Sequence, residues 1–480
     1  MKKSLLVILF VSLSAALFAQ SDLTFYHMGA ATPQSGMVNA SYFPDAEAYF
    51  SFPVISGVSL YAGLGSTYNN LMTPIEGTDS VKVDLNKFLG SIEEGDNLSF
   101  RGDVSLFQFG LLAGGRNFTL FSNLRYQGGM EYPVKFLDYF INGNGNFIGE
   151  QVEERNLRGG AIAFHEIGLG YSQDIIILGD KNLRVGARLK LLTGLAYAST
   201  SENASVSLLT DAEDFSISAT FNDAIFRTAG FDDLQGDDVG SYVVSNDNKG
   251  FGADFGAQLQ VNEKLGVSLA INDIGSINWN QGVENYELVN SQIRLDGFEN
   301  LDDIDLAQAL EDSIDVWSER TTTSESFKTA IGMRAIVGAT YQVLPSGTVS
   351  GSIYRNGSAF GNAEVGFGAG YTHQVGKTLT VSTTILKEQS RPIEVGAGLM
   401  LRVGLLQLYG VFDDAFNIAK DPADIQSTSF RLGLNFMIGR RNTGAKAIRE
   451  KKEKEEISPF PPEYDLDHLL DEEETDGDGG

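Results

Sequence analysis

Cysteine is absent from all 480 residues of the chain. Its absence excludes disulfide bonds, iron–sulfur ligation by thiolates and attachment of a lipid to a cysteine. Basic residues are also scarce, because 35 Lys and Arg stand against 63 Asp and Glu, which gives a formal net charge of -28. A chain of this sign lacks the basic surface that neutralises phosphates, so we exclude nucleic acid as a partner.

Histidine is rare as well, with four in the chain. His165-Glu166 lacks the second histidine that a zinc-protease helix needs four residues after the first. The glycine-rich runs at 366–370 and 396–398 lie inside strand-like patterns with no helix after them, so they do not predict a nucleotide loop. We predict that the protein is not an enzyme and needs no metal or cofactor. A barrel hydrolase with residues scattered along the chain is the alternative.

A long apolar run occurs at the beginning of the chain. Lys2 and Lys3 precede an apolar stretch from Leu5 to Phe18, and Ala19 offers a small residue for cleavage. This pattern is typical of a secretory signal peptide, and the stretch is shorter than the roughly 20 residues of a spanning helix. We predict that residues 1–19 are a cleaved signal peptide, that the protein is exported, and that strands make any membrane crossing.

The clearest strand pattern lies near the C-terminus, from Ser429 to Gly439. Five large apolar residues alternate there with polar, small or less bulky ones: Phe430, Leu432, Leu434, Phe436 and Ile438. A period of two gives a strand one wholly apolar face. Because an open sheet edge is not tolerated in lipid, we predict that this is the closing strand of a transmembrane β-barrel and that it pairs with the first strand.

Similar alternation predicts about fourteen strands and an all-β fold, a transmembrane antiparallel β-barrel over residues 49–439. The first strand begins near Phe50 and is interrupted by Pro53. Short turns alternate with longer connections, the asymmetry of an outer-membrane barrel with both chain ends in the periplasm. We place the hairpin-like residues 204–221 in an external loop, and expect helices over 133–141 and 301–317, the latter acidic and amphipathic.

Charged residues fall on the inward parity of the predicted strands. They are Glu166, Arg184, Arg188, Lys190, Asp254, Arg334, Glu364, Glu394, Arg402 and Arg431. Both signs are present, so the charges can pair across the barrel, which suits a filled interior better than an open pore. Structural pairing is the favoured interpretation, and a substrate site is the alternative.

The composition changes after Gly439. A basic excess up to Lys454 gives way to a tail whose charges are all acidic from Glu463 onward. We predict that residues 440–480 form a disordered periplasmic tail. Apolar residues among its acids give two readings, a solvated end or a docking segment: Phe460, Tyr464, Leu466, Leu469 and Leu470.

Four short motifs occur in order along the N-terminal half: Met37–Asp45, Phe140–Gly149, His165–Ser172 and Gly186–Gly194. In these motifs the chain resembles a Bacteroidota family of uncharacterised outer-membrane proteins related to the long-chain fatty-acid (FadL-type) transporter barrels. The resemblance implies a fourteen-stranded barrel whose N-terminal segment folds into the lumen as a plug.

The expected plug covers residues 20–48, which show no clean strand period. Its motif residues are Asn39, Pro44 and Asp45. In the transporter relatives an Asn-Pro-Ala motif belongs to the plug, whereas Asn39 is followed here by Ala40.

Two functions follow as hypotheses. The resemblance implies passive uptake of hydrophobic small molecules, with such a molecule as the ligand. The tail favours a non-transporting scaffold that docks a periplasmic or secretion-system partner through its tail or loops. In either case the expected partners are outer-membrane lipid and, during biogenesis, the barrel-assembly machinery.

Overall fold

The computed structural model describes residues 22–440 apart from 54, 79, 156, 179–180, 202, 235–238, 289–290, 296–321, 361–362 and 390. The expected signal peptide, the expected helix over 301–317 and the tail with its five apolar anchors therefore lie outside the described residues. The chain divides into a unit that ends at Gly439 and a second unit from Arg440 onward. Among the described helices, none is long and apolar enough to span a membrane.

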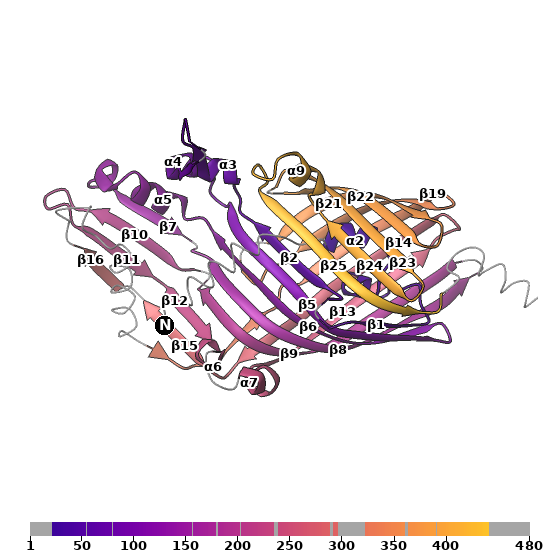
Figure 1. Cartoon of the computed structure of the whole chain (residues 1–480). Coiled ribbons are helices and arrows are strands. Elements are labelled where there is room, and N and C mark those ends of the chain that lie inside the picture. Colours follow the sequence, from indigo (N-terminus) through magenta and orange to yellow (C-terminus); the bar gives the residue numbers. More distant parts are fainter. Residues whose placement is uncertain are drawn as a thin grey trace, which may run out of the picture. The chain divides into compact units, whose positions relative to one another are not determined.

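Fourteen antiparallel strands close into a barrel, which confirms the predicted fold class (Figure 1). In chain order they are β1 (Ala48–Ser51) continued by β2 (Val58–Gly63), β5 (Asn97–Ala113), β6 (Arg116–Glu131), β8 (Gly159–Leu178), β9 (Lys181–Thr200), β13 (Lys249–Gln260), β14 (Leu265–Trp279), β18 (Phe327–Ala330) continued by β19 (Arg334–Leu344), β20 (Gly347–Asn356), β21 (Glu364–Val375), β22 (Leu379–Glu388), β23 (Ile393–Val403), β24 (Leu406–Phe412) and β25 (Ser427–Ile438).

The last strand closes the barrel on the first, as predicted. Phe50 of β1 lies opposite Phe436, and Leu60 of β2 lies opposite Phe430. Both short strands also pair with β5 on their other side, so β1 and β2 together fill one strand position. The break between them contains Pro53, which has no N–H to donate to a ladder. Closure leaves no free edge, the condition that lipid imposes on a sheet.

The lipid-facing side of β25 can be tested at Leu432, in the middle of the strand and 45% exposed. We expect Leu432→Arg to lower the free energy of unfolding by about 2–4 kcal/mol, because an arginine near the bilayer midplane is costly. Phe416→Arg, in the loop helix α9 (Ala415–Lys420), is the matched control and should change little. Urea unfolding in lipid vesicles measures both; equal losses for the two variants would contradict the assigned face.

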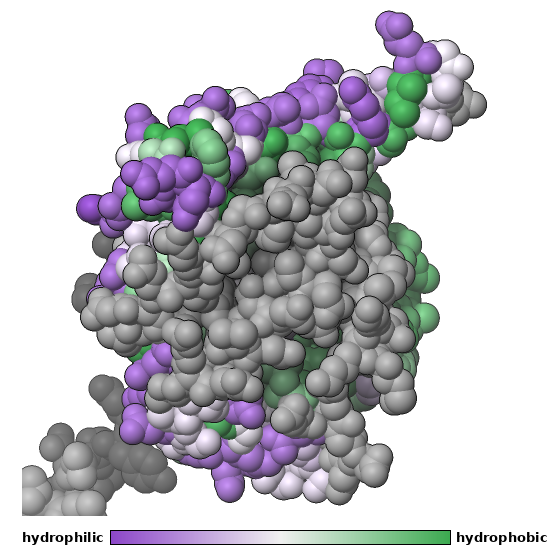
Figure 2. Space-filling model, turned by 90° about the vertical axis from the view of Figure 1, so that its left-hand side faces the viewer, coloured by the Kyte–Doolittle hydropathy of each residue, from purple (hydrophilic) through white to green (hydrophobic). Residues whose placement is uncertain are grey.

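Longer connections carry additional structure at one end of the barrel. β7 (Gln151–Arg155), β10 (Ser205–Thr210), β11 (Ile217–Asn222) and β16 (Ser291–Leu295) form a separate four-stranded sheet. It packs with α5 (Val134–Ile141) and η2 (Asn144–Phe147) around Tyr139. The hairpin expected over 204–221 and the helix expected over 133–141 are thus confirmed. Figure 2 shows hydrophilic residues at the periphery of this long-loop end and hydrophobic residues on a flank of the molecule.

The remaining elements also belong to the long connections. They are α3 (Tyr68–Leu71), β3 (Met72–Pro74), β4 (Val81–Val83), α4 (Leu85–Leu89), β12 (Ala224–Ala229), α6 (Phe231–Leu234), α7 (Val239–Ser245), β15 (Val283–Leu288) and β17 (Thr322–Thr323). Of these, β12, β15 and β17 extend the barrel sheet by pairing next to the end of β9.

The N-terminal residues lie inside the ring of strands. Helix α2 (Asp22–His27) contacts β21, β22, β23 and β24, and Figure 1 shows it enclosed by them. The 3-10 turn η1 (Pro33–Met37) follows and is almost entirely buried. The barrel interior is therefore occupied, and it is the place to look for a functional site.

Candidate functional site: the barrel lumen

Polar side chains of the strands hold the N-terminal segment by its backbone. Five of them donate hydrogen bonds to carbonyl oxygens of the segment: Thr372 to His27 (3.0 Å), Gln407 to Ala31 (2.9 Å), Gln108 to Pro33 (3.0 Å), Arg188 to Gly36 (3.0 Å) and Asn272 to Val38 (2.8 Å). Buried carbonyls without such donors would be costly. The strands therefore supply donors along the whole length of the segment.

Two glycines let the segment approach the wall closely. A Cβ on Gly186 would lie 2.1 Å from the carbonyl oxygen of Ala40, and one on Gly256 would lie 2.1 Å from Oδ1 of Asn39. Asn39 is fully buried, and its Oδ1 accepts hydrogen bonds from the N–H (2.9 Å) and hydroxyl (2.7 Å) of Ser41. The bend of the chain at Asn39 is thus seated directly on β9 and β13.

The other two expected plug residues lie toward the short-turn end. Pro44 is buried, and Asp45 is partly exposed. Arg402 contacts Asp45 by an ion pair of 3.7 Å and a hydrogen bond to its carbonyl oxygen. That a plug is formed by residues 20–48 as a unit stays a proposal, taken up below.

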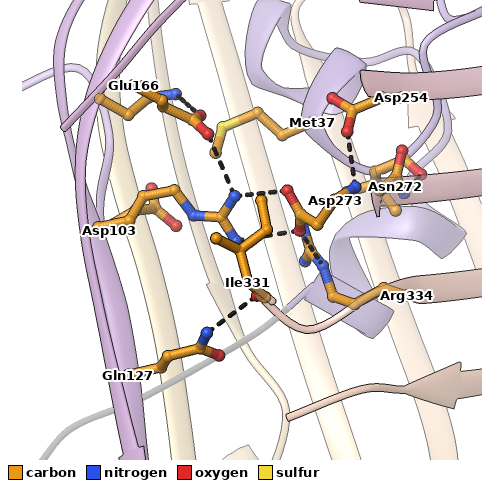
Figure 3. A network of polar contacts seen from close by, with 12 residues as sticks. Met37, Asp103, Gln127, Glu166, Asp254, Asn272, Asp273, Ile331 and Arg334 are labelled. Atoms are coloured by element: carbon orange, nitrogen blue, oxygen red, sulfur yellow. Dashed lines mark hydrogen bonds and ion pairs between the residues drawn. The ribbon is translucent and has the colours of Figure 1, made fainter. Parts of the chain in front are cut away.

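An ion network lies next to the segment, with Asp273 at its centre (Figure 3). The carboxylate accepts two hydrogen bonds from Arg125 (2.6 and 3.0 Å), one from Lys190 (2.7 Å) and one from Arg334 (2.8 Å). Charge-assisted contacts of this geometry are stronger than neutral ones. One carboxylate therefore joins β6, β9, β14 and β19 across the lumen.

Two further carboxylates complete this network. Glu166 contacts Arg125 at 3.2 Å, and Asp254 contacts Lys190 at 2.7 Å and Arg188 at 3.6 Å. Asp254, Asp273 and Glu166 are all essentially inaccessible to solvent. The network consequently lies in a low-dielectric interior, where each charge depends on its partners.

A kink in β14 places Asp273 in the lumen. Pairing with β19 ends at Asn272 opposite Arg334, and pairing with β18 resumes at Ser276 opposite Ala330. Asp273 has φ 62°, the left-handed conformation that Asp tolerates better than most residues. Two consecutive side chains, Asn272 and Asp273, are thereby buried inside, where strict alternation would allow one.

The remaining charges predicted on the inward parity also lie in the lumen. Arg431 makes bidentate contacts with Asp103 (3.1 and 2.7 Å), and Arg184 contacts Asp174 at 2.7 Å. Glu364 pairs with Arg391 at 3.1 Å, and Glu394 accepts a hydrogen bond from Ser427. The structure thus places all ten predicted charges inside, most of them in pairs.

Sequence reasoning missed Asp103, Arg125, Asp273 and Arg391. Arg125 has the inward parity of its strand and could have been found. Asp103 shares its parity with Arg101 and Ser105 and alternates with Val104, so it could have been found as well. Asp273 lies at a kink and Arg391 lies in a connection, where no period-two signal identifies them.

A cavity of about 360 Å³ opens at the long-loop end of the lumen. Its lining mixes apolar side chains with two arginines and four carboxylates: Leu98, Phe100, Met130, Phe360, Arg101, Arg391, Glu94, Asp96, Glu131 and Glu364. Both guanidinium groups lie over the ring of Tyr61, at 4.9 and 4.5 Å from its centroid. Phe360 also packs on Tyr197, with ring centroids 5.7 Å apart. The cavity therefore combines apolar walls with charged groups of both signs.

Smaller cavities follow along the lumen. Two of about 20 Å³, each large enough for one water, share Arg101 with the large cavity. One reaches Leu23 and Glu394, and the other reaches Arg125 and Arg334. A fourth, of about 140 Å³, is lined by Tyr42 and Ser268. The ion network borders the third cavity through Arg125 and Arg334, and the N-terminal segment borders the fourth through Tyr42.

Residues 41–413 match the model of a protein family of unknown function, DUF5723. The chain belongs to this family. The matched region runs from the N-terminal segment through every barrel strand except the last. No curated protein matches the DUF5723 chain.

Several solved structures are similar to the DUF5723 chain at low identity and low TM-score. The toluene transporter TbuX of Ralstonia pickettii has 11% identity and a TM-score of 0.41, over 88% of this chain and 99% of that one. The toluene transporter TodX of Pseudomonas putida has 8% and 0.38, over 87% and 96%. A FadL homologue of Pseudomonas aeruginosa has 10% and 0.35, over 88% and 94%. FadL-type barrels, which the sequence motifs suggested, are thus among these structures.

Asp413 of the DUF5723 chain lies just beyond β24 and accepts a hydrogen bond from the N–H of Thr24 (3.1 Å). Burial raises the pKa of Asp413 to about 7. Burial also raises the pKa of neighbouring Asp414, to about 6, with the Glu394 charge adding to the effect. In contrast, burial lowers the pKa of His27 to about 4; its ring nitrogens contact Ser350 (2.7 Å) and Ser352 (3.1 Å).

The shifted pKa values of Asp413 and His27 predict opposite dependences of stability on pH. A raised carboxyl pKa means that the folded state binds the proton more tightly, so the contribution of Asp413 to stability falls as pH rises from about 4 to 7. His27 contributes stability that is lost as pH falls from about 6.5 to 4. We expect Asp413→Asn to match the wild type near pH 4 and to exceed it by roughly 2–4 kcal/mol at pH 8. Urea midpoints across this range measure the difference; a variant less stable than wild type at pH 8 would refute it.

Proposed function

We propose that the protein is an outer-membrane channel for passive uptake of small hydrophobic molecules. The observation that carries the proposal is the cavity of about 360 Å³ at the long-loop end. Its size is at the lower end of the range for small-molecule sites, and apolar walls with a few fixed polar groups are typical of such sites. The charged groups of the lining carry both signs, so they favour ligands with an apolar body and an uncharged polar end over ligands with an anionic one.

Entry is proposed from the outside, with the long connections external and both chain ends in the periplasm. The ligand would bind between Phe100, Met130 and Phe360, and then pass Arg101, which also borders the two smaller cavities. Residues 20–48 act as a plug in this proposal. The cavities are separate, so passage requires the plug or the lumen side chains to rearrange.

Filling the cavity tests the proposal. Ala363 is half-buried and lines the cavity, so Ala363→Trp should occupy much of it. Ala212→Trp is the matched control, because Ala212 is exposed in a connection of the four-stranded sheet. Toluene and oleate serve as an uncharged and an anionic probe, measured by equilibrium binding to purified protein and by uptake into cells that lack the wild-type protein.

We expect Ala363→Trp to weaken probe binding at least about tenfold, since a filled pocket loses the ligand's apolar contacts. The control should bind as the wild type does. Equal binding and uptake by wild type and both variants would refute the proposed channel.

The scaffold hypothesis, in which the tail or the loops dock a periplasmic or secretion-system partner, stays a prediction, and residues 441–480 of the tail lie outside the described residues. The signal peptide, the periplasmic position of the tail, docking through its five apolar anchors and the origin of the chain in a Bacteroidota family stay predictions.

A further inference from the structure

Positively charged side chains lie on the outer surface of the barrel at its long-loop end. At the long-loop ends of the fourteen barrel strands, four described charged side chains face outward and are cations: Lys249, Lys328, Arg355 and Lys387. We call these four residues the cationic ridge. All four are exposed, and all four come from strands in the half of the barrel between β13 and β22.

Strand register brings the first two residues of the ridge together. Asn278 of β14 pairs with Lys249 of β13 on one side and with Lys328 of β18 on the other. Two strand spacings of about 4.8 Å separate the lysines, so their backbones are roughly 10 Å apart. Long lysine side chains reach across this distance. Nζ of Lys249 donates to the hydroxyl of Thr193 (3.2 Å), on the strand beyond.

The ridge borders the apolar surface of the barrel. Two positions from each of three cations, toward the middle of the strand, the outward residue is large and apolar. Phe251 lies next to Lys249, Ile353 next to Arg355 and Ile385 next to Lys387. These apolar residues are 72%, 55% and 57% exposed. Large exposed apolar residues of this kind face lipid tails. The cations therefore lie where the tails end and the headgroups begin.

Carboxylates at the same strand ends face the other way. Glu364, Glu388 and Glu394 point into the lumen, where Arg391 contacts the first two at 3.1 and 2.8 Å. The chain has a net charge of -28, so its composition alone would favour acidic side chains on the outer surface. At these strand ends the carboxylates instead face the lumen and the cations face outward. Four cations therefore face the membrane side of this rim although the protein is strongly acidic, with exposed Asp247 and Glu325 in the adjoining connections.

We propose that the cationic ridge binds the phosphate groups of anionic lipids in the leaflet at the long-loop end. Exposed ammonium and guanidinium groups at headgroup depth provide charge and hydrogen-bond donors for phosphate oxygens. Each cation near an anionic membrane surface raises lipid association by about fivefold. The assignment to the outer leaflet rests on the orientation proposed above, whereas the lipid binding itself does not.

Lipid selectivity can be measured with the full chain in phosphatidylcholine vesicles. Spin-labelled phosphatidic acid and spin-labelled phosphatidylcholine report, by electron paramagnetic resonance, the fraction of each lipid that is motionally restricted by the barrel. The test variant carries Lys249→Gln, Lys328→Gln, Arg355→Gln and Lys387→Gln. The control carries Arg116→Gln, Lys264→Gln and Lys377→Gln at the short turns. Heat-modifiability gels check that each variant is folded.

We expect the wild type to prefer phosphatidic acid at least about fivefold, and about 1 M NaCl to reduce this preference. The test variant should approach equal association with the two lipids, while the control keeps most of the preference. The proposal is overturned if the wild type shows no preference, or if the control loses as much of it per charge as the test variant. Uptake of toluene and oleate is a separate measurement, so either result leaves the proposed function to its own test.

Discussion

Asp273→Asn is expected to lower the free energy of unfolding by about 3–5 kcal/mol, the cost of removing one partner from a buried ion network. The carboxylate contacts Arg125, Lys190 and Arg334 at 2.6–2.8 Å and is completely buried. Asparagine has nearly the same shape and also tolerates φ 62°. The effect therefore reports the lost charge rather than a strained backbone.

Urea unfolding in lipid vesicles, followed by tryptophan fluorescence, measures this loss. Asp174→Asn is the matched control, because Asp174 pairs with Arg184 at 2.7 Å and both side chains are 19% exposed, so this ion pair is less buried than the Asp273 network. The free energy of unfolding of the Asp174→Asn variant should fall by no more than about 1 kcal/mol. If the two variants unfold at the same urea concentration, Asp273 does not hold the lumen together.

Deletion of residues 21–38 behind an intact signal peptide is expected to convert a closed barrel into a conducting one. These residues include α2 and η1, which are buried inside the strands and fill the lumen beside β21–β24. A fourteen-stranded barrel without them leaves room for water and ions. Planar-bilayer recordings should show resolvable single-channel steps for the deletion and near-zero conductance for the wild type.

A substitution in the full-length chain gives an independent test of the same expectation. Gly186→Val places side-chain atoms where the carbonyl of Ala40 now lies, so it should displace the segment and produce intermittent conductance. Gly351→Val is the control, because a Cβ there meets its nearest neighbour at 3.9 Å. Near-zero conductance from a correctly folded deletion and from Gly186→Val would exclude a plugging role for residues 20–48.

The sequence by itself determined the barrel, its strand number and the direction in which most strand residues face. Lipid-facing positions are apolar and lumen-facing positions are polar or small. Apolar and polar residues therefore alternate along each strand, and this alternation can be seen in the sequence of a single strand without its neighbours. Phe430 to Ile438 show this most clearly, and the pairing of Phe436 with Phe50 followed from the need to close the sheet. The ten lumen charges were located by the same parity.

Tertiary structure alone decided which charges meet and what the lumen holds. Asp273 contacts Arg125, which is 148 residues away, because a kink at φ 62° turns it inward. Lys249 and Lys328 become neighbours through Asn278, whose strand lies between theirs. Such contacts depend on register between strands that are distant in the chain, and on irregular backbone at kinks. Neither is encoded in a local period, because the energy that fixes them arises only when the barrel has closed.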